Sequence, residues 1–85
     1  MKKWKHRLNL SDVFHNDDLE FEEIRDQTVA RLKASSFYRE VVSERFGFED
    51  LADELGDTET VGQFDFIWNI VYDYADNYDC WISTT

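Results

Sequence analysis

Apolar residues recur at helical spacing most regularly between Thr58 and Ala75, a stretch that contains no basic residue. The i, i+3, i+4, i+7 spacing of a buried helical stripe is met by Val61, Phe64, Trp68, Val71 and Ala75. Three more apolar side chains widen this stripe: Ile67, Ile70 and Tyr74. We therefore expect a central helix that is contacted on more than one side. It should start at Asp57 and Thr58, with Thr58 as its cap, and finish near Asp76 or Asn77.

The same spacing predicts a single turn and three further helices, at residues 11–15, 18–34, 37–46 and 48–55. Residues 16–18 are suited to starting the first of these helices, and Ser35 or Ser36 to capping the next. Gly47 predicts the turn between the two short helices, and Gly56 is expected just beyond the end of the second. The central helix therefore follows a series of shorter helical segments.

Apolar and polar residues alternate with a period of two near both ends of the chain, over residues 3–10 and 78–84. This alternation predicts two short strands. A lone strand leaves its backbone hydrogen-bonding groups unsatisfied, so we expect the two strands to pair, in an orientation that the sequence leaves open. Pairing would bring a basic first strand against an acidic last segment, that is, Lys3, Lys5 and Arg7 against Asp76 and Asp79.

The predicted fold class is α+β, in a single domain over residues 1–85. Three or four helices surround the central helix of the C-terminal half, and a small two-stranded sheet joins the N- and C-terminal segments. The composition supports a folded domain, because 42% of the residues are hydrophobic and 16% aromatic, and disordered chains are poor in both. A chain this short buries only roughly 60% of its unfolded surface, so its core should be dense and rich in aromatic rings.

Charge is distributed unevenly along the chain, whose net charge is −10 at pH 7. Residues 1–10 contain four basic residues and no acidic one, whereas residues 46–85 contain ten acidic residues and no basic one. Nucleic acid and anionic membranes repel such a chain, and basic surfaces attract it. We therefore expect a partner protein with a basic surface, for example a nucleic-acid-binding protein, and no direct binding to nucleic acid or membrane.

Carboxylates of the C-terminal half recur at helical spacing. Like charges one turn apart destabilise a helix by about 0.2–0.5 kcal/mol per pair, and an ordinary solvated face mixes basic residues among the acids to avoid this. Two interpretations follow: an acidic surface that only keeps the protein soluble, or an acidic helical face that docks on a basic protein surface. The candidate partner-binding residues are Glu49, Asp50, Asp53, Glu54, Asp57, Asp65, Asp73 and Asp76.

The spacing of these carboxylates also permits a nucleic-acid mimic. Carboxylates on one helix face lie about 5–6 Å apart, within a couple of ångström of the phosphate spacing along a nucleic-acid strand. A protein that binds nucleic acid could therefore accept such a face in place of its usual ligand.

No motif of the chain indicates catalysis, a cofactor or a metal. A nucleophile elbow, a glycine-rich phosphate loop and a CxxC motif are all missing from the sequence. His6 is expected to be a partly buried packing residue of the first strand. His15 lies near Asp12, Asp17 and Asp18, but these residues lack the ligand number and spacing of a zinc or calcium site. We predict a non-enzymatic protein with no cofactor and no metal.

Cys80 is the only cysteine, so the chain cannot form an internal disulfide, and a reducing, cytoplasmic setting is favoured. The adjacent Asp79 favours a raised thiol pKa and an inert packing role for Cys80. The sequence contains no run of about 18 apolar residues, and no apolar stretch follows the basic N-terminus. Neither a membrane span nor a signal peptide is therefore expected.

The aromatic residues support an alternative function. They are numerous enough that a small core could leave some of them outside, where they would form a patch for self-association or for a structural role. The residues concerned are Trp4, Phe14, Phe37, Phe46, Phe48, Trp81 and the four tyrosines.

A resemblance to known proteins extends over nearly the whole chain and is weakest at residues 37–57. The residues that carry it are Trp4, the stretch LNLSDVF at 8–14, Phe21 to Glu23, Arg25, Asp26, Arg31, Leu32, Phe64, Asp65, Trp68, Tyr72, Asp73, Ala75, Asp76, Trp81 and Ile82. Through them the chain resembles a group of small acidic proteins encoded by phages and prophages of actinobacteria. The resemblance implies an accessory gene product that acts inside the bacterial host cell, for instance in anti-defence or transcription control. It implies no catalytic residue and no site residue.

Overall fold

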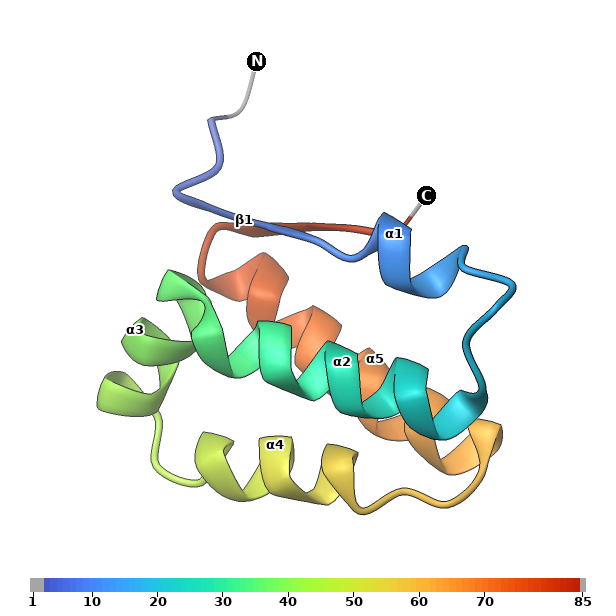
Figure 1. Cartoon of the computed structure of the whole chain (residues 1–85). Helices are drawn as coiled ribbons and strands as arrows, with labels where there is room; N and C mark the ends of the chain where they lie inside the picture. The colour runs from blue at the N-terminus through green and yellow to red at the C-terminus, as the bar shows by residue number, and fades with distance from the viewer. Residues whose placement is uncertain (1–2, 85) are drawn as a thin grey trace.

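A two-stranded sheet joins the two ends of the chain in the computed structural model, which describes residues 3–84 (Figure 1). The strands are β1 (His6–Asn9) and β2 (Cys80–Ser83). Between them the chain forms α1 (Ser11–Phe14), α2 (Phe21–Ala34), α3 (Ser36–Glu44), α4 (Phe48–Gly56) and α5 (Val61–Asn77). The predicted α+β class and the pairing of the two terminal segments are confirmed.

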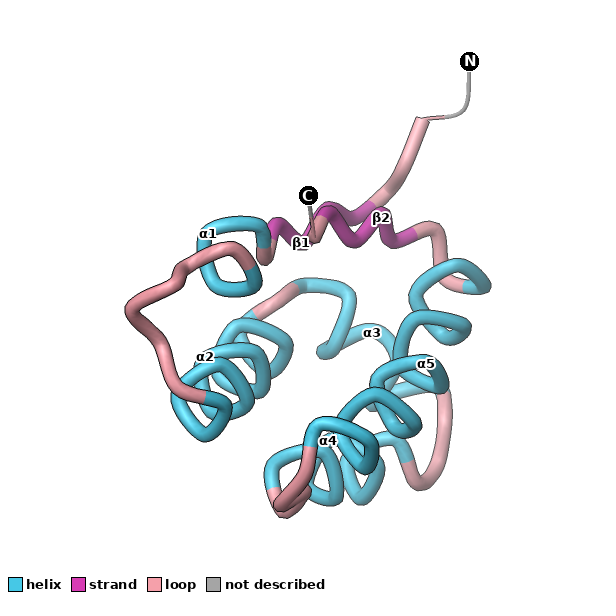
Figure 2. The backbone as a smooth tube through the Cα atoms, turned by 90° about the vertical axis from the view of Figure 1, so that its right-hand side faces the viewer, coloured by secondary structure: helices cyan, strands magenta, loops and turns pink. Residues whose placement is uncertain are grey.

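The two strands run parallel, with the register His6 opposite Cys80 through Asn9 opposite Ser83. Parallel neighbours need a crossover connection, and here all the helices lie in that connection. The inner face of the sheet places Leu8, Cys80 and Ile82 in the core. Figure 2 shows the sheet as a cover over the helices, with α4 on the far side of the molecule.

Both strands are shorter than the predicted 3–10 and 78–84. Tyr78 closes α5, and its amide donates to the carbonyl oxygens of Tyr74 and Ala75. Asp79 then takes a left-handed conformation with φ of 56°, which turns the chain out of the helix. The strand β2 therefore begins at Cys80, directly after Asp79, whose carbonyl oxygen accepts a hydrogen bond from the His6 amide at 2.9 Å.

Aromatic rings fill the space around α5, as the composition predicts. The Phe48 ring of α4 lies 4.8 Å from that of Tyr74, between centroids. From the other side, Phe14 lies 5.6 Å from the Trp68 ring. Phe21 at the start of α2 meets the Phe64 ring edge-on at 5.9 Å. Thus α5 packs against α4 and β2, and aromatic rings of α1 and α2 also contact it.

The start of α5 differs from the prediction. Its first residue is Val61, and its cap is Thr60, whose hydroxyl accepts a hydrogen bond from the Gln63 amide at 3.1 Å. Thr58, the predicted cap, is buried and donates instead to the Leu55 carbonyl at 2.8 Å. The hydroxyl of Thr58 thus closes the preceding helix and leaves the capping of α5 to Thr60.

Val61 was expected in the buried stripe, yet 67% of it is exposed. Side chains of a helix lean toward its N-terminus, so the first side chain of α5 leans off the end of the helix into solvent. The other four residues of the predicted stripe are buried.

The start of α2 also lies later than predicted. The predicted starters at 16–18 form a turn of their own, in which the Asn16 side chain accepts from the Asp18 amide at 3.0 Å. The cap is Glu20, which forms a reciprocal capping box with Glu23. Glutamate is not among the preferred capping residues, so the sequence favoured residues 16–18 over Glu20 as the start of this helix.

The two short helices occur close to their predicted places. Ser35 caps α3 by accepting from the Tyr38 amide at 3.1 Å, and α3 ends at Glu44 rather than at residue 46. Gly47 has a φ of 97°, a conformation that favours glycine, and it opens α4. Gly56 was predicted to lie just beyond α4, but it is the last residue of that helix.

Candidate protein-binding surface

Five of the eight predicted carboxylates come from α4 and the residue after it, and all five are exposed. The buried side of α4 is formed by Phe48, Ala52 and Leu55. Asp53 projects toward α2, where its carboxylate accepts a hydrogen bond from the Lys33 ammonium at 2.7 Å. Glu49 lies one turn before Asp53 on the same flank. The outward row of α4 therefore consists of Asp50, Glu54 and Asp57.

The other three predicted carboxylates lie on α5, and each is exposed. Tyr74 marks the flank of α5 that faces α4, because its ring packs against Phe48. Each residue of a helix is rotated by about 100° from the one before, so Asp65 and Asp76 project from the flank opposite Tyr74. Asp73 lies between these two flanks, on the outward side.

The eight carboxylates therefore do not form one continuous stripe. Six of them form two rows on neighbouring helices, which we call the acidic surface: Asp50, Glu54 and Asp57 on α4, and Asp65, Asp73 and Asp76 on α5. Phe66 lies on the outward side of α5, seven residues before Asp73 and thus almost in line with it. Its ring is 70% exposed, so an aromatic side chain accompanies the carboxylates of the α5 row.

Basic side chains of the described chain form their ion pairs away from the acidic surface. Arg31 binds Asp12 through two hydrogen bonds, the longer at 2.7 Å, and Arg25 contacts Asp26 at 3.0 Å. The Arg31 guanidinium holds the pKa of the Asp12 carboxyl below its usual value. Lys5 binds Glu40 of α3 at 2.5 Å, although it was expected to face the acidic last segment. No ion pair within residues 3–84 involves any carboxylate of the acidic surface.

A hydrogen-bonded network fastens β1 to α3. The His6 ring, only 9% exposed, has Nδ1 at 2.7 Å from the Ser36 hydroxyl and Nε2 against the Glu40 carboxylate. Lys5, followed by His6, lowers the pKa of Glu40 by hydrogen bonding to its carboxylate. The burial predicted for His6 is confirmed, but its two polar contacts were not foreseen, because Ser36 and Glu40 lie about 30 residues away in the sequence.

A serine, a histidine and a carboxylate in series are also the groups that activate a nucleophile in hydrolases. Neither of the two surface hollows described below includes any of these three residues. The contacts of His6 with Ser36 and Glu40 connect β1 to α3.

The other candidate reactive residues take structural positions. Burial raises the pKa of the Cys80 thiol to about 11, and the side chain packs in the core. Asp12, which was considered with His15 as a possible metal ligand, forms an ion pair with Arg31. Within residues 3–84, no three side chains of the types that bind metals gather closely enough to hold an ion.

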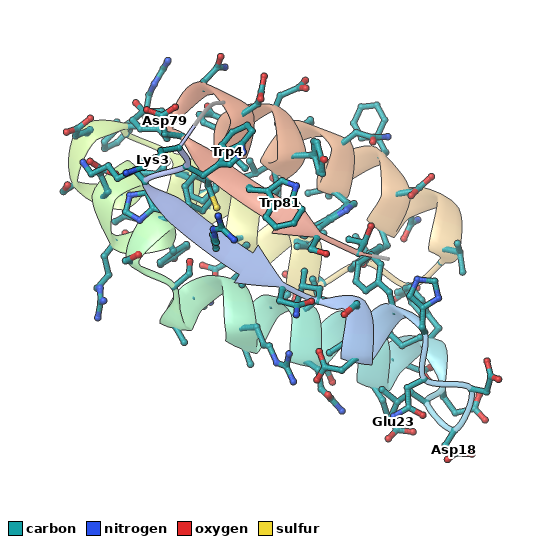
Figure 3. The ribbon with its side chains drawn as sticks, turned by 90° about the horizontal axis from the view of Figure 1, so that it is seen from above. Lys3, Trp4, Asp18, Glu23, Asp79 and Trp81 are labelled. Carbon is teal, nitrogen blue, oxygen red and sulfur yellow. The ribbon has the colours of Figure 1, made fainter. Side chains whose placement is uncertain are left out.

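The aromatic residues divide between core and surface. Phe37 and Phe48 are buried, and Phe14 packs against α5, so these three do not contribute to an exposed patch. Trp81, 43% exposed, lies on the outer face of the sheet (Figure 3). Phe46 is fully exposed in the turn between α3 and α4. These exposed rings lie on separate elements rather than in a single patch.

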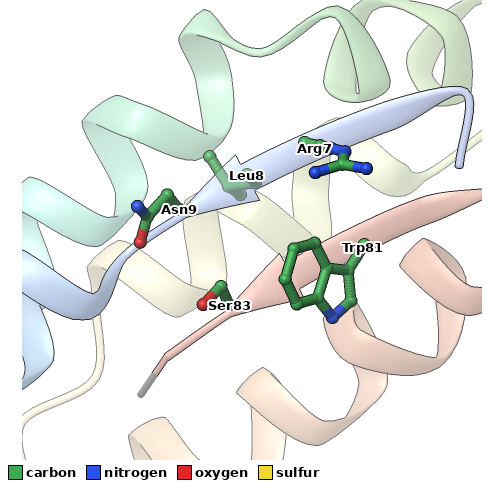
Figure 4. A pocket seen from close by; sticks show the side chains of 5 residues that line it. All are labelled: Arg7, Leu8, Asn9, Trp81 and Ser83. Carbon is green, nitrogen blue, oxygen red and sulfur yellow. The ribbon is translucent and has the colours of Figure 1, made fainter.

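Two shallow hollows adjoin these exposed rings. One lies on the outer face of the sheet between Arg7, Asn9, Trp81 and Ser83, with Leu8 beneath, and has a volume of about 200 Å³ (Figure 4). The other, of about 250 Å³, adjoins the turn between α3 and α4 and is lined by Val42, Arg45, Phe46, Gly47, Glu49 and Asp50.

The sequence contains one signal for the start of α5 that the prediction missed. Thr60 and Gln63 have the spacing of a capping box, a threonine followed three residues later by glutamine. By contrast, no local pattern announces the contact of Arg7 with Trp81, because it depends on the register of strands from opposite ends of the chain.

Comparison of the chain with protein-family models, with curated proteins and with solved structures finds no match. Among the described residues, no helix combines the length and the apolar character that crossing a membrane requires.

Proposed function

We propose that this protein is a non-enzymatic binding protein that docks its acidic surface on a basic surface of another protein. One observation carries the proposal: residues 46–85 contain ten acidic residues and no basic one, and the six carboxylates of the acidic surface are exposed without an ion pair in the described chain. Such a surface repels itself, and lysine and arginine side chains of a partner would relieve that repulsion.

The exposed Phe66 supports a protein partner over small counterions. Protein interfaces commonly combine an apolar or aromatic centre with a polar rim. Phe66 lies in line with Asp73 on the outward side of α5, so a partner could bury this ring while its basic side chains meet the neighbouring carboxylates. Simple cations would neutralise the charge but would leave the ring in water.

The two rows also support the narrower proposal of a nucleic-acid mimic. Carboxylates one turn apart lie about 5–6 Å from one another, a spacing met by Asp50, Glu54 and Asp57 on the α4 side and by Asp73 and Asp76 on α5, whereas Asp65 lies about two turns before Asp73. A nucleic-acid-binding protein of a bacterial host, bound in this way, would be kept from its usual ligand. This accords with the proposed setting of a phage or prophage accessory protein in the host cytoplasm.

The proposal is tested by capture of partners from an actinobacterial lysate. The test variant combines Asp50→Asn, Glu54→Gln, Asp65→Asn and Asp73→Asn. The matched control removes four exposed charges elsewhere, with Asp17→Asn, Asp18→Asn, Glu22→Gln and Glu44→Gln. We expect the wild type and the control to recover the same proteins, released by salt, and the test variant to lose them.

Two results would contradict the proposal. Equal recovery by the wild type and the test variant would show that the acidic surface is not the binding surface. Equal loss by the test variant and the control would show that total charge, rather than these two rows, governs the binding.

A further inference from the structure

The Phe46 ring projects fully into solvent, with a relative exposure of 106%. It lies in the turn between α3 and α4, where Gly47 redirects the chain with a φ of 97°. Glu49 and Asp50 line the same hollow as Phe46. Arg45 also lines it, but its guanidinium donates to the Tyr78 hydroxyl at 2.9 Å and lies over the Tyr74 ring. The turn therefore presents an aromatic knob that is bordered by carboxylates.

The hollow on the outer face of the sheet is suited to one side chain. Two cross-strand pairs border it, Arg7 with Trp81 and Asn9 with Ser83. Its volume of about 200 Å³ is below the 300–1,000 Å³ that small-molecule pockets usually have. Trp81 supplies an aromatic wall, and Leu8 also lines the hollow (Figure 4).

Arg7 gives this hollow a positive charge. Its guanidinium lies 5.4 Å from the centre of the Trp81 ring, and no ion pair of the described chain involves it. A phenyl ring placed beside the indole would gain an aromatic contact. Carboxylates next to that ring would meet the unpaired guanidinium.

We propose that Phe46 of one copy of this chain inserts into the Arg7–Trp81 hollow of a second copy, with Glu49 and Asp50 close to Arg7. The knob and the hollow lie at different ends of the molecule, the sheet at the top of Figure 1 and the α3–α4 turn at the lower left. The contact is therefore head-to-tail, and each copy can bind one neighbour at each end. One inserted ring with its neighbouring carboxylates makes a small interface, and small interfaces are expected to be weak.

The first test is the concentration dependence of the molecular mass, measured by sedimentation equilibrium over roughly 0.01–1 mM, a range suited to weak interfaces. We expect the average mass of the wild type to rise beyond that of a dimer. Phe46→Ser and Arg7→Glu should each remain monomeric. Phe66→Ser, which removes another exposed ring, should associate like the wild type.

The second test mixes two variants that each keep one half of the contact. Phe46→Ser keeps the hollow, and Arg7→Glu with Trp81→Ala keeps the knob. Each alone should be monomeric, and their mixture should form dimers that grow no further. Circular dichroism establishes that each variant is folded, and Arg7→Glu alone replaces the double variant if the loss of Trp81 disturbs the sheet.

The proposal is overturned if the wild type stays monomeric, if Phe46→Ser associates normally, or if Phe66→Ser loses association to the same extent. It is also overturned if the mixture stays monomeric while the wild type associates. Phe46→Ser keeps every carboxylate of the acidic surface, so it should still capture the basic partners proposed above. Failure of the self-contact can therefore be distinguished from failure of the acidic surface.

Discussion

His6 is the side chain through which β1 is held against α3. Its ring joins Ser36 to Glu40, and Lys5 completes the network from the adjacent position. The pKa of the Glu40 carboxyl is lowered by the hydrogen bonds from Lys5 and then from His6. A lowered pKa means that the folded state binds the proton less readily than the unfolded chain, so this contribution to stability is present above the ordinary value of 4.5 and is lost as the pH falls below it.

Glu40→Gln should therefore destabilise the protein at pH 7, and the difference from the wild type should shrink as the pH falls from about 5 toward 3. Urea midpoints of both proteins across this range measure the effect. Glu44→Gln, an exposed change one helical turn later, should give a much smaller difference at pH 7. A difference for Glu40→Gln that stays constant with pH would contradict the assigned ionic contacts.

Cys80 should react slowly while the protein is folded. Its pKa of about 11, raised by burial from 9.0, means roughly 100-fold less thiolate at pH 8 than in the unfolded chain. Labelling with a chromogenic disulfide reagent should therefore be slow in buffer and fast in concentrated urea. Because the chain has one cysteine, the signal comes from this side chain alone, and equal rates in both solvents would show that Cys80 is accessible.

At the scale of the elements, the start of α5 depends on one hydroxyl. Thr60→Ala removes the oxygen that accepts from the Gln63 amide and should lower the free energy of unfolding by about 1 kcal/mol. Thr60→Ser keeps that oxygen and should retain most of the stability. Denaturant titration measures both variants, and a Thr60→Ala protein as stable as the wild type would mean that another group caps the helix.

The elements themselves could be predicted from the sequence more reliably than their ends. The 3.6-residue and two-residue periods, which reflect which side chains are buried, identified the helices and both strands. Helix ends depend instead on single hydrogen bonds, and Thr58 and Thr60 look alike until the structure shows which hydroxyl faces Leu55. The parallel orientation of the strands depends on the packing of all the helices between them, which local periodicity does not record.

The sequence predicted which carboxylates are exposed, but it did not predict how they are arranged on the two helices. The lack of basic residues after Arg45 marked all eight carboxylates, and all eight are exposed. The division of six of them between two rows, and the pairing of Asp53 with Lys33, follow from how α4 packs against α2 and α5. Spacing within one helix cannot show which flank a neighbouring helix will cover.

At the scale of the whole molecule, charge is separated between opposite sides. Lys5 and Arg7 belong to the sheet side and the α4 carboxylates to the far side (Figure 1). With a net charge of −10, we expect repulsion among carboxylates to outweigh the few surface ion pairs, which typically contribute about 0–1 kcal/mol each.

Salt should therefore stabilise the folded state. The Debye length falls from about 30 Å at 0.01 M to about 8 Å at 0.15 M, which screens this repulsion. The melting temperature at pH 7 should rise over that range in both sodium and choline chloride. The rise should be smaller for the variant with Asp50, Glu54, Asp65 and Asp73 neutralised, and a fall for the wild type would show that attractive pairs dominate.

The parallel sheet has a consequence for how the protein is made. β1 leaves the ribosome before any of the helices α1 to α5, but its hydrogen-bonding partner, β2, is not translated until all of them have been. During elongation, Leu8 therefore lacks its cross-strand neighbour Ile82. The nascent chain then carries an unpaired strand edge of the kind that favours aggregation. Stalling translation before residue 80 should leave a chain that proteases and chaperones recognise as unfinished, even with α2, α3 and α4 already synthesised.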